Sequence, residues 1–470
     1  MEAFRLAIVG AGPSGIVDAI SVCKVLKGEH VVIDIYDPGL PFRGRSFNTG
    51  SERMLLNTSV GVSFIDPEEP DGFERFLVHD QGLHVSTGDV VPRDLASAFL
   101  EKELSVARTY ISGVNFISDR VYDLYVNTKG GKPCIHVNEE ITDYDAVIIS
   151  TGLQFKKDVG FLQGEKILPP YPAKNLTDMD RRASVLILGS KLSAVDTLAH
   201  LAGCEHEGRI DICSTSQLFP SVRKQVIKPT ERSFLNHYLM RSGKLPNDYS
   251  LISCMLDMLD QHFLEHGMYL TDFIAPGDRD SVAQLNYEIQ LCNQKQNVWE
   301  DILMDVIDGL NTVWPRLSLD DKKRFNIEVN SWLGRIAHSM PLRNARTISE
   351  LFSSGQLSMI NVDDLSTINT DNYDVIINTT GLQTADTDSL LSHLAGKQLL
   401  QFNGLGGVSI NTNNHRLRED LPIYANGSIV QGEVFTANSV YSTSYGAQKI
   451  AADINRVFDE YHRLANVFQD

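Results

Sequence analysis

The chain has 470 residues, more than one hydrophobic core usually organises, so we expect two or three domains. Its 42% hydrophobic and 22% charged residues are typical of a globular, soluble protein. The formal net charge of -18 opposes non-specific binding to nucleic acid and to anionic membranes, and both are excluded as general partners.

Neither a secretory signal nor a membrane span is predicted. The chain enters an apolar strand at residues 4–9 without the basic and apolar regions of a signal peptide. No run approaches the roughly 20 apolar residues of a spanning helix. The six cysteines include no CxxC pair, which predicts reduced thiols and no metal site. We therefore expect a cytoplasmic protein that acts on a small molecule.

The first predicted unit binds a dinucleotide. The strand leads into the turn GAGPSG (residues 10–15), and apolar residues at helical spacing follow. Gly10 permits the tight turn, Gly12 lets the backbone approach a pyrophosphate, and Gly15 lets helix and strand pack closely. Asp37 ends the next strand about 20 residues later, where a carboxylate accepts hydrogen bonds from ribose hydroxyls.

A second unit of this kind opens with LILGSKLSAVD near the middle of the chain. Gly189 keeps the first glycine position, Ala194 replaces the third, and Lys191 occupies the middle one. The Cβ of Lys191 is expected to crowd the turn and to disfavour a left-handed φ by ~1 to 2 kcal/mol. Its ammonium, with the hydroxyls of Ser190 and Ser193, would instead attract phosphates. Removing the side chain in Lys191→Gly is predicted to tighten NAD(P)H binding.

The strand after the second turn ends in Ser214, Thr215 and Ser216, where NADPH-binding proteins usually place an arginine for the 2′-phosphate. Arg223 and Lys224 come only later. Hydroxyls also bind phosphate, so NADPH is favoured and NADH stays possible.

Two segments of the chain are near copies, YDAVIISTGLQ and YDVIINTTGLQ. Each follows one glycine turn and is predicted to close a parallel sheet. Their exits, Thr151-Gly152 and Thr380-Gly381, place small residues where the backbone passes near a cofactor or enters another domain. The pair indicates two homologous nucleotide domains.

The stretch between the second turn and its closing strand has a different character, with apolar residues at helical intervals and few turn signals. Trp299, Trp314 and Trp332 are interpreted as core residues of this insertion. The predicted organisation is a first nucleotide domain that begins at 1–175, a second at 176–225 and 341–385, a helical insertion at 226–340 and a C-terminal part at 386–470.

Further segments, in order RMLLNTSVG, LFPSVRKQ and IYANGSIVQGEVFTANSVYSTSYGAQKIA, accompany the two turns. Together they resemble the bacterial FAD/NAD(P)-binding protein family, two-domain flavoproteins distantly related to class B flavin monooxygenases and amine N-hydroxylases. The resemblance implies an α/β fold with two Rossmann-like domains. FAD would bind the first domain, at 1–175 and completed by 386–470, and NAD(P)H the second, at 176–225 and 341–385. The FxGxxxHxxxW signature is absent, which argues against ketone oxygenation.

The resemblance also implies site residues. Leu56, Asn57 and Thr58 would reach toward the isoalloxazine, and Val121 would meet the adenine through its backbone. Ser428 stands where many flavoproteins have an aspartate for the ribityl chain; its hydroxyl would still hydrogen-bond FAD, but less strongly than a charged acceptor. The expected cofactor-binding residues are Gly10, Gly12, Pro13, Ser14, Gly15, Asp37, Leu56, Asn57, Thr58, Val121, Thr151, Gly152, Gly189, Ser190, Lys191, Ser193, Thr380, Gly381, Gly427 and Ser428.

The candidates for the catalytic site are Asn57, Asn438, Tyr441 and Ser442, and Tyr441 is expected to donate a hydrogen bond to an oxygen species at the flavin. Each is equally compatible with an ordinary turn or helix-cap role. The expected activity is that of an FAD-dependent, NAD(P)H-using monooxygenase that uses molecular oxygen on an amine or other soft nucleophile.

Two alternatives stay open. One is a flavin-dependent dehydrogenase or oxidase of an amine or amino-acid intermediate, with a degenerate NAD(P) domain. The other is a non-catalytic flavoprotein that senses redox state or supports assembly. The sequence carries no signal for an oligomeric state.

Overall fold

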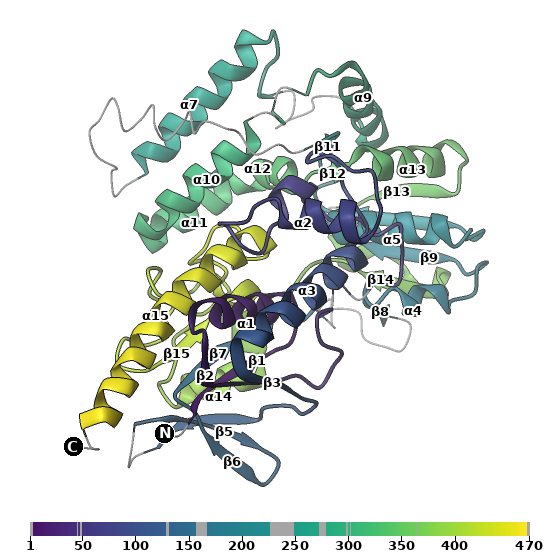
Figure 1. Cartoon of the computed structure of the whole chain (residues 1–470). Coiled ribbons are helices and arrows are strands. Elements are labelled where there is room, and N and C mark those ends of the chain that lie inside the picture. Colours follow the sequence, from purple (N-terminus) through teal and green to yellow (C-terminus); the bar gives the residue numbers. More distant parts are fainter. Residues whose placement is uncertain are drawn as a thin grey trace.

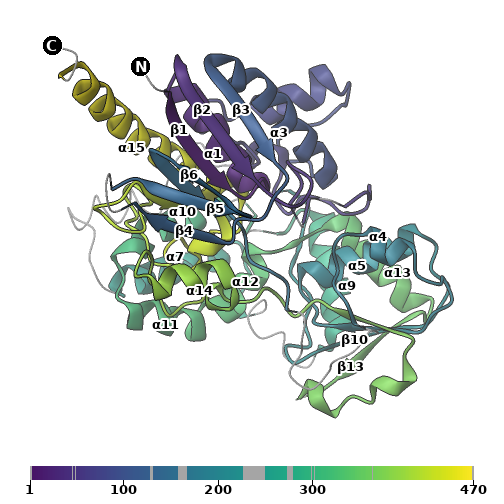
Figure 2. The same cartoon turned by 90° about the horizontal axis from the view of Figure 1, so that it is seen from below.

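The computed structural model describes residues 3–44, 46–47, 49–127, 131–156, 167–225, 249–271, 279–297, 299–300, 302–362 and 364–467. These residues contain two five-stranded parallel sheets flanked by helices and a separate group of helices (Figures 1 and 2). The predicted α/β class with two Rossmann-like domains is confirmed.

The first sheet has the strand order β15-β7-β1-β2-β3. Its central strands are almost fully buried because helices cover one face and a small antiparallel sheet lies toward the other. The strands are β1 (Phe4–Val9), β2 (Gly28–Tyr36), β3 (Ile111–Ile117), β7 (Ala146–Ile149) and β15 (Ile423–Ala425). The covering elements are α1 (Pro13–Val25), α3 (Arg93–Ala107), α14 (Ser389–Gly396), α15 (Val440–Val467) and the small sheet β4 (Asp123–Val126), β5 (Pro133–Val137) and β6 (Glu140–Asp143). Helix α2 (Gly72–Arg75) packs on α3 through Phe73 and Phe99.

The second sheet has the order β13-β10-β9-β14-β8, which repeats the first sheet strand for strand. In each, the strand before the glycine turn lies between its successor and the closing strand of the repeated motif. The strands are β8 (Ile167–Leu168), β9 (Val185–Leu188), β10 (Ile210–Ser214), β13 (Leu357–Asn361) and β14 (Val375–Asn378), with helices α4 (Lys174–Thr177), α5 (Leu192–Gly203), α9 (Ser281–Gln294) and α13 (Leu342–Ser353).

The duplication extends to side chains. Tyr144, at the start of the first copy, donates a hydrogen bond to Asp34 on β2 at 2.9 Å. Tyr373, at the same place in the second copy, donates to Asp211 on β10 at 2.5 Å. Both nucleotide units therefore fasten the closing strand to the second strand in the same way.

The two Thr-Gly-Leu-Gln exits carry the chain between the domains. The N–H of Gln383 donates to the carbonyl of Gln154 at 2.7 Å, and Phe155 pairs with Leu382 in an antiparallel bridge. The first exit leads to β8 of the second sheet, and the second leads back toward β15 of the first. Since β8 lies at 167–168, the second sheet begins inside the range 1–175 that we assigned to the FAD domain.

The helical insertion contains α7 (Ser250–Glu265), α10 (Leu303–Val313), α11 (Leu319–Glu328) and α12 (Asn330–Ala337) around one apolar core. Trp299 and Trp314 are buried in that core, and Trp332 packs at its edge. A short parallel pair, β11 (Val222–Arg223) and β12 (Met340–Pro341), joins its two ends. Residues 226–248 of the expected insertion lie outside the described residues.

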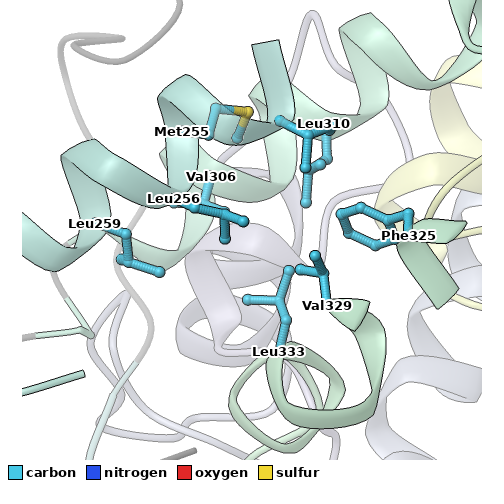
Figure 3. A pocket seen from close by; sticks show the side chains of 9 residues that line it. Met255, Leu256, Leu259, Val306, Leu310, Phe325, Val329 and Leu333 are labelled. Carbon is cyan, nitrogen blue, oxygen red and sulfur yellow. The ribbon is translucent and has the colours of Figure 1, made fainter. Parts of the chain in front are cut away.

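Two observations refine this insertion. Helix α9 falls within the expected range but packs on α13 of the second domain. The pocket of Figure 3 has only apolar lining side chains, from α7, α10 and the α11–α12 region, and is therefore a packing gap of the core. Its lining residues are Ile252, Met255, Leu256, Leu259, Val306, Leu310, Phe325, Val329 and Leu333.

A buried ion pair joins the two nucleotide domains. Arg93, at the start of α3, contacts the carboxylate of Asp196 on α5 at 2.5 Å, and both side chains are almost fully buried. Tyr171 donates to the same carboxylate, and Arg93 Nε donates to the carbonyl of Leu55 at 2.9 Å. Because two charges withdrawn from water are stable only together, this contact holds the domains in one orientation.

We predict that Asp196→Ala lowers the free energy of unfolding by about 3–5 kcal/mol, because it leaves the Arg93 charge buried and unpaired. The double variant Arg93→Met/Asp196→Leu should recover most of this loss. Chemical denaturation measures both values. Glu207→Ala, which breaks an exposed pair with Arg182, is the control and should cost less than about 1 kcal/mol. Equal losses for the buried and the exposed pair would contradict the assignment.

Candidate functional site

The first glycine turn has the geometry of a pyrophosphate site. Gly10 has a φ of +112°, and a Cβ there would lie 2.4 Å from the carbonyl oxygen of Ser150. A Cβ on Gly15 would lie 1.9 Å from the carbonyl oxygen of Gly10. At Gly12, the nearest atom to an added Cβ is 3.6 Å away, on Gly44, and no side chain caps the helix that follows. Gly12 therefore places no side chain at the start of α1, where uncapped N–H groups and the helix dipole would favour an anion.

Two distant segments converge on this turn. Gly427 has a φ of +75°, and a Cβ there would lie 2.4 Å from the hydroxyl of Ser14. The hydroxyl of Ser428 accepts a hydrogen bond from the N–H of Leu153 at 2.9 Å. Thr151 Oγ1, beside these segments, is buried and has no hydrogen-bond partner among the described residues. A closed turn with an unsatisfied hydroxyl beside it fits a polar cofactor such as FAD.

Asp37 braces the turn from the end of β2. Its carboxylate accepts hydrogen bonds from the N–H of Ala11 at 2.8 Å and of Gly39 at 2.7 Å. The side chain of Val121 is buried in the same cluster as Val9 and Tyr36, directly beside this strand end. Asp37 and Val121 thus lie at the same end of the sheet, and their contact with the adenosine half of FAD stays a prediction.

The segment at Leu56–Thr58 is held from two sides. The N–H of Leu56 donates to the carbonyl of Val91 at 2.8 Å, and the hydroxyl of Thr58 pairs with that of Ser63 at 2.7 Å. The carbonyl of Asn57 accepts a hydrogen bond from Arg223 Nη2 at 2.7 Å. The backbone of this segment is therefore fixed, and the half-buried Asn57 is carried on it.

Arg223 is a structural residue that the sequence did not reveal. Its place in the sequence indicates only a basic residue that follows the expected phosphate position, but its side chain is completely buried. It also donates to the carbonyl of Ser339 at 3.3 Å, so it joins β11, β12 and the Asn57 segment. Burial lowers the pKa of its guanidinium to about 10, with Glu300 opposing the shift. Arg223 cannot contact a nucleotide unless its side chain leaves the protein interior. Its role is structural, because it connects β11 with the residue before β12 and with the Asn57 segment.

Tyr441 lies where the first domain meets the insertion. Its hydroxyl donates to Asp308 on α10, and its ring packs against Phe64 with a centroid distance of 5.2 Å. Burial, followed by the contact with Asp308, raises the pKa of this phenol. Because the hydroxyl hydrogen is already donated, Tyr441 is not available as the expected donor to oxygen while Asp308 holds it.

The other two candidates border the same helix start. Ser442 shares a hydrogen bond with the hydroxyl of Thr436, and its N–H donates to Ser439 Oγ at 3.1 Å. Ser439 thereby caps α15. Asn438 is exposed in the turn before the helix. These contacts match the helix-cap interpretation of Ser442 and leave Asn438 open to solvent.

The second turn has the same backbone geometry as the first, and this geometry corrects our expectation for Lys191. Gly189 has a φ of +98°, and a Cβ there would lie 3.0 Å from the hydroxyl of Thr379. Lys191 has φ -86° and ψ -168°, close to the values of -71° and 178° at Gly12. The left-handed strain that we expected at Lys191 is therefore absent, because this position is extended in both turns. Ala194 fits completely buried at the third position.

Several hydroxyls at the second turn are already bonded within the protein. Ser190 Oγ donates to the carbonyl of Leu218 at 2.8 Å, and Thr380 Oγ1 donates to Asn378 Oδ1 at 2.7 Å. Ser193 lies half-buried in the first turn of α5. Gly381 has a φ of +113° in the exit beside it. Lys191, at the cap of α5, is exposed, and its ammonium is the charge that this turn would offer to a phosphate.

The two units differ at the position predicted to bind the ribose. Gly10 donates to the carbonyl of Tyr36 at 2.8 Å, and Gly189 donates to that of Cys213 at 2.7 Å, so Asp37 and Ser214 are equivalent. A carboxylate stands in the first unit and a hydroxyl in the second.

No three or more His, Cys, Asp or Glu side chains come together as metal ligands in the described ranges. The same ranges contain no helix that is both long and apolar enough to cross a membrane.

Residues 7–154 match the protein family described as FAD-NAD(P)-binding. This match confirms the predicted cofactor class and the family-level resemblance for the first nucleotide domain. No curated protein matches the chain.

Solved structures share the fold across the whole chain. Ornithine hydroxylase from Pseudomonas aeruginosa superposes with a TM-score of 0.60 at 14% identity, over 97% of this chain and 100% of that one. Ornithine N-hydroxylase from Kutzneria sp. 744, with reduced FAD, NADP+ and L-ornithine, gives 0.60 at 12% identity, over 97% and 99%. L-lysine 6-monooxygenase from Pseudomonas syringae gives 0.57 at 13%, over 96% and 99%. These likenesses show a shared fold.

We predict that Gly15→Ala weakens FAD binding about a hundredfold or more, because its Cβ would overlap the carbonyl of Gly10. The matched variant at the second turn, Ala194→Gly, should leave FAD affinity unchanged. Flavin fluorescence on titration of the apoprotein measures both. Wild-type affinity in Gly15→Ala would show that the first turn does not hold the pyrophosphate.

Proposed function

We propose that this protein is an FAD-dependent monooxygenase that takes electrons from NAD(P)H and oxygenates an amine or other soft nucleophile of a small metabolite. The observation that carries the proposal is the pair of equivalent glycine turns in one chain, each with a positive-φ glycine locked against the closing strand. The whole-length likeness to amine-hydroxylating proteins supports the choice of reaction.

The residues of the chain serve mainly to bind and to exclude water. Bound FAD would supply the hydride-accepting and oxygen-activating chemistry. Helix α10 packs on the start of α15 and on the segment before it, because Asp308 accepts a hydrogen bond from Tyr441 and Asn311 donates to Thr436 Oγ1 at 3.1 Å. Trp314, in the turn after α10, donates its ring N–H to the carbonyl of Gly432 at 2.9 Å. This docking closes the insertion over the C-terminal part of the FAD domain, and such closure protects a reactive site from solvent.

The second turn favours NADPH. Ser214 replaces the carboxylate of the first unit, so no acidic side chain at this position repels a 2′-phosphate. Lys191 adds an exposed positive charge at the start of α5. The six cysteines are all free, which fits a reducing compartment, and we propose the cytoplasm.

An oxidase or dehydrogenase with a degenerate second domain is the second candidate. It is favoured by the hydroxyls of Ser190 and Thr380, which are bonded within the protein. The undistorted backbone at Lys191 counts against it, because the turn keeps the conformation of the intact one.

Anaerobic reduction separates these functions. We expect NADPH to bleach the visible band of bound FAD rapidly, NADH to do so more slowly, and oxygen with an amine substrate to restore it with hydroxylated product. Bleaching by an amine alone would favour the oxidase. Failure of every donor would favour a non-catalytic flavoprotein.

Lys191→Ala should weaken NADPH binding about threefold to tenfold, because it removes the charge nearest to the phosphates without relieving any backbone strain. This reverses our expectation for Lys191→Gly. Titration at low and high salt provides the measurement, and the difference should shrink as salt rises. Arg182→Ala, an exposed cation elsewhere on the second domain, is the control. Tighter binding in the variant would show that the lysine obstructs the site.

A further inference from the structure

Asp18 is a completely buried carboxylate in the helix that follows the first glycine turn. It accepts a hydrogen bond from Ser150 Oγ at 2.7 Å and from Asn426 Nδ2 at 2.6 Å. Among the described residues, no cation pairs with it. A buried carboxylate without a counter-charge is unfavourable, so its presence at this place calls for a physical reason.

Both partners of Asp18 directly precede residues that are predicted to bind the cofactor. Ser150 is followed by Thr151 and its carbonyl contacts Gly10, while Asn426 is followed by Gly427. The amide oxygen of Asn426 also accepts the N–H of Gly427 at 2.9 Å. One carboxyl group therefore ties together the helix of the glycine turn, the first exit and the C-terminal turn.

The charge of Asp18 opposes the charge of the ligand. The pyrophosphate of a dinucleotide would lie at the N-terminus of α1, and Asp18 sits further along the same helix. Ionised Asp18 and the pyrophosphate would repel each other at a site with little water to screen them. A protonated Asp18 removes this repulsion.

The surroundings of Asp18 place its titration in the physiological range. Burial raises the pKa of the carboxyl to about 7, and the hydrogen bonds from Ser150 and Asn426 limit the rise. The elements packed on α1 are β1, β7, α3 with the turn that follows it, and α15. Ser150, after β7, is the group that they direct at the carboxyl, and none of them adds a charge that acts on it.

We propose that Asp18 is a positioning residue of the FAD site and that its carboxylate takes up one proton from solvent when FAD binds. The inference rests on FAD binding at the first turn, as the proposed function does. The proton stays on a carboxyl oxygen and can be donated to Ser150, whose hydroxyl also accepts hydrogen bonds, while Asn426 keeps donating to the other oxygen. Release of FAD returns the proton to solvent.

The sign of the pH dependence follows from this linkage. Below pH about 7, Asp18 is protonated with or without FAD, so the affinity does not change with pH. Above that pH the free protein is ionised, and each bound FAD must bring in a proton. The affinity should then fall by up to about tenfold per pH unit, until the pH passes the raised pKa of the complex.

The test is calorimetric titration of the apoprotein with FAD between about pH 6 and about pH 9, in two buffers of different ionisation enthalpy. We expect affinity to fall about threefold to thirtyfold across this range, with net proton uptake on the alkaline side. Asp18→Asn should bind FAD with a flat pH profile and without this uptake. Asp18→Ala, which leaves Ser150 and Asn426 without their acceptor, should bind FAD more weakly at every pH.

Asp34→Asn is the matched control, because Asp34 is a buried carboxylate on β2 of the same sheet but pairs with Arg5. It should keep the wild-type pH profile. A pH-independent wild-type affinity, or a wild-type profile in Asp18→Asn, would overturn this inference alone. Absence of FAD binding at every pH would overturn the proposed function with it. Proton uptake by the wild-type protein decides the matter even where a variant fails to fold.

Discussion

The contact between Arg93 and Asp196 is the constraint on which the rest of the structure depends. It joins residues 103 positions apart and ties α3 of the first domain to the opening helix of the second. Moving either domain would expose or separate two charges that are stable only when paired. Arg93 also holds the carbonyl of Leu55, next to the segment expected at the flavin. Arg93 thus contributes both to the relative position of the two turns and, together with Arg223 and Val91, to the backbone shape of the segment predicted to lie at the flavin.

The two nucleotide domains on either side of this contact have the same strand order and the same fastening of the closing strand. Both units lock a positive-φ glycine against the closing strand and fasten that strand through a tyrosine and an aspartate. They differ where the ligand is expected. Gly15 has no room for a Cβ, whereas its equivalent Ala194 is accommodated. The first turn is thus more closely packed than the second. This difference is in keeping with a tightly bound FAD at the first turn and a nucleotide that binds and dissociates at the second.

Local patterns in the sequence were sufficient for the parts of the fold that depend on local chemistry. The glycine turns, the repeated closing strands and the core tryptophans follow from spacing and residue type. Contacts between distant segments do not. Asp18, Arg93 and Arg223 look like ordinary polar residues until folding buries them against partners far along the chain. Only for Asp18 does the sequence contain an indication of burial, because this aspartate interrupts an apolar run directly after the first turn.

The expectations that changed did so for identifiable reasons. Strain at Lys191 was inferred from residue type, but φ is set by the local backbone, which is extended there. Tyr441 was placed by its position in the chain, and helix α10 provides a closer partner in Asp308. Strand β8 joins the second sheet because the first exit crosses between domains before its own domain is complete.

A crystal structure of the protein grown with FAD and NADP+ tests the central claim most directly. The account predicts FAD on the turn at residues 10–15 and NADP+ on the turn at residues 189–194, with the Arg93–Asp196 contact intact. A second turn without nucleotide at saturating NADP+, or a nucleotide bound only after the two domains have rotated and this contact has broken, would contradict it.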